Sequence, residues 1–128
     1  MTRRERLRKL ANVQEQLKAF HEMRHATFRA QAAAAEGEAN ALRERFDAEG
    51  SMSALFPEVY HRRIERALER AAQNLTLAKE EAGRVATATA RTNMVERAYR
   101  TVSRDEERAR AEKDILEMVL RGQSKNRD

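Results

Sequence analysis

The sequence predicts an all-α protein, a long two-helix antiparallel coiled-coil hairpin, on three observations. Charged residues make up 37% of the 128 residues and aromatic residues 5%, and there are one Pro and four Gly. Ala, Arg and Glu are abundant, and these residues favour helices over strands. Much of the apolar content is Ala, so the larger apolar side chains suit a narrow interface between long helices. A chain of this length holds one domain, residues 1–128.

The first helix is expected at about residues 3–48, where apolar residues recur at spacings of three and four. One extra spacing of four, between Arg24 and Phe28, predicts a local interruption of the heptad pattern. The residues expected to face the other helix are Leu10, Val13, Leu17, Phe20, Arg24, Phe28, Ala32, Ala35, Ala39, Leu42 and Phe46.

The loop is expected at about residues 49–56, because Gly50, Ser51 and Ser53 gather there ahead of Pro57. Pro is well tolerated in the first turn of a helix, where its missing N–H has no acceptor. The second helix is therefore expected at about 57–121. Arg121 followed by Gly122 is typical of a helix C-terminus, which leaves residues 122–128 as a flexible tail.

The register follows from the position of the loop. A turn near residue 53 pairs residues whose numbers sum to about 106, which sets Phe46 against Tyr60 and Leu42 against Ile64. The first helix then runs out opposite residue 103, and the rest of the second helix forms a C-terminal helical overhang. This overhang carries Ile115, Leu116, Val119 and Leu120 on one face. Exposed apolar patches of this kind usually mark interaction sites.

The sequence offers little for catalysis. His21 and His25 are four residues apart, and the register brings Glu81 near His25, so a zinc site is conceivable. Two solvated histidines on a polar face are the favoured interpretation. There is no Cys, no Gly-rich phosphate loop and no nucleophile–base pair. We therefore expect no enzymatic activity and no catalytic, cofactor-binding or metal-binding residues.

The basic charge is concentrated at the N-terminus. Residues 1–9 contain Arg3, Arg4, Arg6, Arg8 and Lys9 against Glu5, a net +4 out of the chain's +5. Along the helices, acidic residues alternate with the basic ones and weaken the field that would attract phosphates, so nucleic acid is not an expected partner. No apolar run approaches the roughly 20 residues of a membrane span, and no signal peptide is evident.

The segment Tyr60–Ala71 (YHRRIERALERA), directly after a Gly/Ser turn, resembles the post-loop segment of the FliJ/YscO-like stalk proteins of type III protein export. Three further features are similar to that family. They are a Leu-x-x-Leu opening at Leu7 and Leu10, an aromatic residue before the loop at Phe46, and a charged C-terminal stretch at 110–117.

The resemblance implies a non-enzymatic cytoplasmic stalk, peripheral to the inner-membrane export apparatus of a flagellum or injectisome. It would link a hexameric export ATPase to the export gate membrane protein, with export chaperones as further candidate partners. We expect a monomer, with a weak antiparallel dimer as the alternative. The loop end (Leu42, Phe46, Tyr60, Ile64) would contact the gate, unless these residues only close the hairpin. The terminal end (Arg3, Arg4, Arg6, Ile115, Leu116, Val119, Leu120) would contact the ATPase.

Two other classes remain open from the residues themselves. A general coiled-coil adaptor or chaperone-like protein would bind its partners along the helices. A nucleic-acid-associated coiled coil is less favoured, and its binding would weaken steeply with salt.

Overall fold

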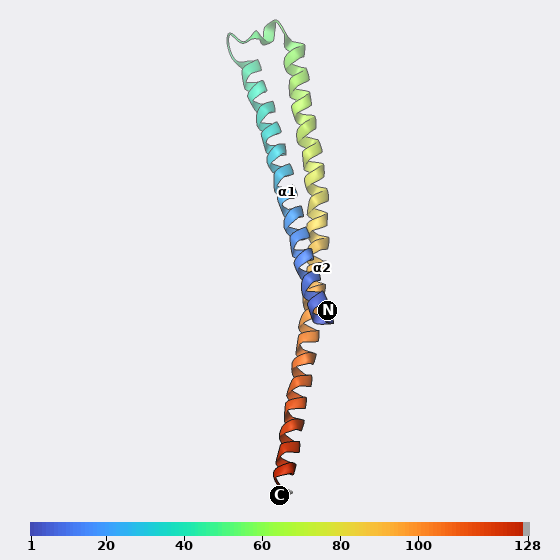
Figure 1. Ribbon diagram of the computed structural model, residues 1–128. Coiled ribbons are helices and arrows are strands. Elements are labelled where there is room, and N and C mark those ends of the chain that lie inside the picture. Colours follow the sequence, from blue (N-terminus) through green and yellow to red (C-terminus); the bar gives the residue numbers. More distant parts are fainter. Residues whose placement is uncertain (127–128) are drawn as a thin grey trace. The chain divides into compact units, whose positions relative to one another are not determined.

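The computed structural model describes residues 1–126, and these form two long helices in an antiparallel hairpin (Figure 1). Helix α1 spans Arg3–Asp47, a short 3-10 helix η1 spans Met52–Ala54, and α2 spans Pro57–Asn126. The described part of the chain contains no strand, which confirms the all-α fold. None of its helices is long and apolar enough to cross a membrane.

A capping box begins α1. The Thr2 hydroxyl accepts a hydrogen bond from the Glu5 backbone N–H, and the Glu5 carboxylate accepts one from the Thr2 backbone N–H, both at 3.1 Å. This reciprocal pair satisfies two backbone donors that the first turn of a helix leaves without partners. Helix α1 therefore begins at Arg3, directly after its cap.

The loop is close to its expected position. Gly50, three residues after the end of α1, has φ +75°, a left-handed conformation that Gly adopts without strain. This conformation belongs to the turn that follows α1. Ser51 caps η1, with its side chain accepting a hydrogen bond from the Ser53 backbone N–H. Pro57 then occupies the first position of α2.

The C-terminal end of α2 differs from the expectation. The helix continues past Gly122 to Asn126, five residues beyond the end expected at 121. A helical Gly costs only about 1 kcal/mol relative to Ala, which is too little to end a long helix by itself. The last two residues of the expected tail, 127–128, lie outside the described residues.

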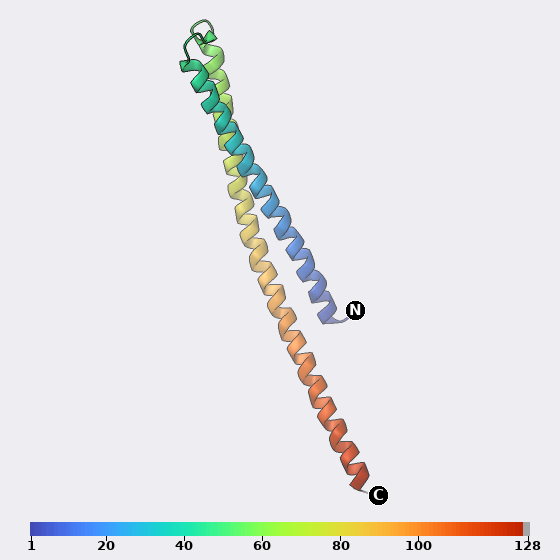
Figure 2. The ribbon, with the colours of Figure 1, turned by 90° about the vertical axis from the view of Figure 1, so that its left-hand side faces the viewer.

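The chain divides into two compact units, which we describe separately. The loop-end unit is Gln16–Ala88. The terminal unit is Met1–Glu15 together with the part of α2 after Ala88. In both Figure 1 and Figure 2, the ends of α1 and α2 next to the loop lie side by side.

In the loop-end unit, each helix turns one face toward the other, and we call these two faces the seam. The seam residues of α1 are Lys18, His21, His25, Phe28, Ala32, Ala35, Ala39, Leu42 and Phe46; those of α2 are Tyr60, Ile64, Ala67, Ala71, Asn74, Ala78, Glu81, Val85 and Ala88. All are buried or half-buried, and their spacing alternates between three and four without interruption. This is a regular heptad pattern.

The interruption expected between Arg24 and Phe28 is therefore absent from the pattern of burial. Leu17 and Phe20, which were expected in the seam, are 42% and 46% exposed, and each precedes a seam residue by one position. Leu10 and Val13 in the terminal unit are exposed in the same way. At this level polar residues such as Lys18 and His21 occupy the seam positions, and the large apolar residues lie beside them. The expectation was wrong here because it placed the large apolar residues in the seam.

Candidate functional site

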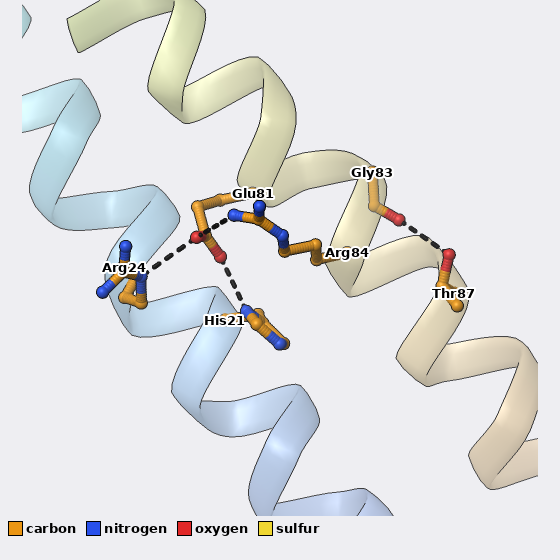
Figure 3. Close-up of polar contacts among 6 residues, drawn as sticks. All are labelled: His21, Arg24, Glu81, Gly83, Arg84 and Thr87. Atoms are coloured by element: carbon orange, nitrogen blue, oxygen red, sulfur yellow. Dashed lines mark hydrogen bonds and ion pairs between the residues drawn. The ribbon is translucent and has the colours of Figure 1, made fainter.

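The loop-end unit contains a buried carboxylate, Glu81, with three polar partners (Figure 3). Its side chain is 1% exposed. The Nε of Arg24 donates to Glu81 Oε1 at 2.9 Å, and Nη1 of Arg84 donates to the same oxygen at 2.7 Å. The Nδ1 of His21 lies 2.7 Å from Oε2. Two of the three partners come from α1 and one from α2, so the carboxylate connects the helices.

The environment of Glu81 has opposing effects on its pKa. Burial raises the pKa, because it disfavours the charged form. The hydrogen bonds from His21, Arg24 and Arg84 together act more strongly and lower the pKa to about 2. The carboxylate is therefore ionised at neutral pH and accepts all three hydrogen bonds, so His21 Nδ1 is the donor in its pair.

Arg24 also stacks on aromatic rings. Its guanidinium carbon lies 5.5 Å from the centre of the Phe20 ring and 5.4 Å from that of Phe28. These cation–π contacts hold Arg24 beside the seam and orient its Nε toward Glu81. The Phe20 ring, which lies outside the seam, and the Phe28 ring, which lies within it, thus both support the polar cluster.

This arrangement corrects the expected neighbour of Glu81. The register pointed to His25, whereas the carboxylate contacts His21, one helical turn earlier in α1. Among residues 1–126, no three His, Asp or Glu side chains are grouped so that they could hold a metal ion. The cluster is a network of ion pairs that joins the two helices.

The four residues expected to contact a partner at the loop end belong to the seam. Leu42 is 6% exposed, and Phe46, Tyr60 and Ile64 are half-buried. The rings of Phe46 and Tyr60 meet edge to face with their centres 6.0 Å apart, which confirms the expected pairing. These contacts favour the alternative that the four residues close the hairpin.

Other apolar side chains at the loop end are exposed. Met52, Leu55, Phe56 and Val59 are 54%, 69%, 53% and 47% exposed. We call these four residues the tip surface. The spacing of apolar residues did not predict this surface, because three of its four residues precede α2 and such spacing describes only residues within helices.

In the terminal unit, Arg4 connects the basic N-terminal residues to α2. Its Nε donates to the Tyr99 hydroxyl at 3.4 Å, its guanidinium lies over the Tyr99 ring at 5.7 Å, and its Nη1 is 3.6 Å from Glu106 Oε2. The hydrogen bond from Arg4 lowers the pKa of Tyr99. Arg3 and Arg6 are exposed. The contacts of α1 therefore reach Glu106, slightly beyond residue 103.

The overhang begins after Glu106, since residues 107–126 are all exposed. Ile115, Leu116, Val119 and Leu120 are 62%, 59%, 50% and 56% exposed. We call these four residues the terminal patch. Adjacent Met118 is 70% exposed and extends the apolar surface.

Comparison with known proteins adds no assignment, because no family model, curated protein or solved structure matches this chain.

Proposed function

We propose that the protein is a non-enzymatic coiled-coil stalk or adaptor of a type III protein export apparatus, linking the hexameric export ATPase to the export gate. The terminal patch carries this proposal. Four large aliphatic side chains, each at least half exposed, lie on one face of α2 beyond the last contact with α1. Complete burial of each would contribute roughly 1.5–3 kcal/mol, so a partner that covers them gains substantial affinity.

The basic N-terminal residues support an acidic partner at the same end of the terminal unit. Arg3 and Arg6 are exposed, while Arg4 is held against Tyr99 and Glu106. Their charges increase the rate of association with an acidic surface, and the terminal patch supplies the apolar contact. We assign the ATPase to this end and the gate to the loop end, with export chaperones as further partners. The proposed location is cytoplasmic, at the inner-membrane export apparatus.

The test is binding of the purified export ATPase from the same organism, measured by titration calorimetry. The double variant Leu116→Ser/Val119→Ser should lose about tenfold or more in affinity, because two apolar contacts are removed. Its helicity and melting should match the wild type, since both residues are exposed. Met94→Ser is the matched control, because Met94 is 67% exposed on α2 outside the terminal patch. Unchanged ATPase binding by the double variant would contradict the assignment of this end.

A general coiled-coil adaptor is the second candidate function. Leu17 and Phe20 are exposed along α1 in the loop-end unit, and a helix from a partner bound lengthwise would cover them. Under this alternative, Leu17→Ser would weaken partner binding while Leu116→Ser/Val119→Ser would not. The same titrations therefore distinguish the two candidates.

A further inference from the structure

In the loop-end unit, α1 carries two adjacent pairs of side chains that are each suited in spacing to face α2. Lys18 and His25, seven residues apart, lie in the seam and are half-buried. Leu17 and Arg24, also seven residues apart, precede them by one position, and they are 42% and 45% exposed. A leucine therefore lies outside the seam while the lysine next to it lies inside.

The residues of α2 at this level suit Leu17 better than Lys18. In the register that the aromatic contact next to the loop sets, Leu17 and Lys18 both lie at the level of Ala88. Ala88 is 5% exposed, and Val85, one turn away in α2, is half-buried. Burial against these apolar groups disfavours the charge of Lys18, whereas it favours Leu17.

Glu81 lets Arg24 exchange with His25 at little cost. The Nε of Arg24 already donates to Glu81 Oε1 at 2.9 Å from beside the seam, and the Glu81 side chain is 1% exposed. On entering the seam in place of His25, Arg24 keeps this carboxylate as its partner, so no unpaired charge is buried. Exchange of both pairs therefore buries Leu17 and keeps Arg24 paired.

The exchange needs a rotation of α1 about its own axis and no slip along it. Phe28 lies in the seam, and Leu17 is eleven residues before it. Eleven residues make three turns of about 3.67 residues, close to a straight α-helix, so less left-handed supercoiling brings Leu17, Arg24 and Phe28 onto one face. The heptad winding in the structure presents Lys18 and His25 instead.

We propose that this part of α1 has two discrete packings against α2. The heptad packing, which the structure contains, has Lys18 and His25 in the seam, and the eleven-residue packing has Leu17 and Arg24 there. A helix with two discrete packings carries a change at one point to another point along it. A partner that covers the exposed Leu17 favours the heptad packing. The proposal does not depend on the proposed function.

The test uses cysteine pairs in the full chain, which has no Cys of its own. Leu17→Cys/Ala88→Cys reports the eleven-residue packing, and Lys18→Cys/Ala88→Cys reports the heptad packing. The measurement is the equilibrium constant of each disulfide against a glutathione buffer. Arg24→Leu makes the eleven-residue face apolar, so it should raise the constant of the first pair several-fold and lower that of the second. Lys18→Leu makes the heptad face apolar and should lower the constant of the first pair several-fold.

Ala39→Cys/Ala67→Cys is the matched control, because both residues are 0% exposed in the seam. Its constant should be the same with and without Arg24→Leu or Lys18→Leu. A constant for Leu17→Cys/Ala88→Cys that neither substitution changes would overturn the two packings. Equal changes in the Leu17 and Lys18 pairs would also overturn them, because they indicate general loosening of the helices.

Labelling of single cysteines checks the same exchange without a disulfide. With Arg24→Leu, Leu17→Cys should react with iodoacetamide several-fold more slowly and Lys18→Cys several-fold faster, because the first enters the seam and the second leaves it. Circular dichroism should show equal helicity for all variants. Labelling rates that stay constant, or that both rise, would count against the exchange.

Discussion

The Nδ1 of His21 in α1 donates to the carboxylate of Glu81 in α2 across 2.7 Å, at a level where polar residues enter the seam. Toward the loop, the seam consists largely of Ala. A helix slipped by one heptad would place Glu81 opposite different residues and separate it from His21 and Arg24. Buried polar residues in coiled coils fix register in this way, at a cost in stability.

Replacing Glu81 separates its charge from its volume. Glu81→Gln should lower the melting temperature by a few degrees, because the amide keeps the size but loses the ionic hydrogen bonds from Arg24 and Arg84. Glu81→Leu should melt at or above the temperature of Glu81→Gln, since an apolar side chain needs no partners. Thermal unfolding followed by circular dichroism is the measurement. A Glu81→Gln variant that melts like the wild type would show that the network contributes nothing.

The same residue predicts a dependence of stability on pH. The pKa of Glu81 is lowered from 4.5 to about 2 on folding, so the folded state favours the ionised form. Its contribution is complete at a pH above the unfolded pKa and is lost as the pH falls through the folded pKa. The difference in unfolding free energy between wild type and Glu81→Gln should therefore shrink between about pH 5 and pH 2. Urea unfolding across this range checks it, and a difference that stays constant would be inconsistent with the shift.

Leu42 and Leu55 allow a buried and an exposed leucine of the loop-end unit to be compared. Leu42→Ala should cost about 2–4 kcal/mol of stability, because Leu42 is 6% exposed in the seam and its truncation leaves a cavity. Leu55→Ala should change stability by less than about 0.5 kcal/mol, because Leu55 is 69% exposed. Denaturant unfolding of both variants measures the contrast. Equal losses would mean that Leu55 packs within the hairpin.

Two glycines within the helices offer a route to higher stability. A Cβ added at Gly37 or Gly83 would meet no atom within 4 Å apart from its chain neighbours and the backbone of its own helix, and neither residue has a positive φ. Gly37→Ala and Gly83→Ala should each stabilise the protein by about 0.5–1 kcal/mol. Gly50→Ala is the control and should destabilise, because Gly50 has φ +75°. A stabilising Gly50→Ala would argue that the loop changes conformation.

The sequence was informative wherever local chemistry decides the structure. Pro57 and Gly50 located the loop, and the sum of residue numbers about the turn predicted the contact of Phe46 with Tyr60. It was misleading where polar residues enter the seam, because the large apolar residues Leu17 and Phe20 lie one position away from the heptad. Gly122 also predicted a helix end that the structure lacks, since one glycine does not supply the contacts that end a helix.

The candidate sites were harder to predict than the fold. The patch at Ile115–Leu120 followed from the difference in helix length, which the position of the loop already determined. The tip surface did not follow, because exposure in a loop depends on backbone hydrogen bonds such as that from the Phe56 N–H to the Met52 carbonyl. The partners of Glu81 likewise depend on side-chain conformations that spacing alone does not determine.

The seam toward the loop limits how this sequence can change over evolutionary time. Ala32, Ala35, Ala39, Ala67, Ala71 and Ala78 are each at most 5% exposed. Every substitution except Gly or Ser adds volume at these buried positions, and over-filled sites of this kind cost about 1–3 kcal/mol. Almost no substitution at these six positions is therefore neutral for stability, whereas the exposed faces of the same helices are free to vary. Descendants of this chain should keep the alanines long after the surface charges have been exchanged.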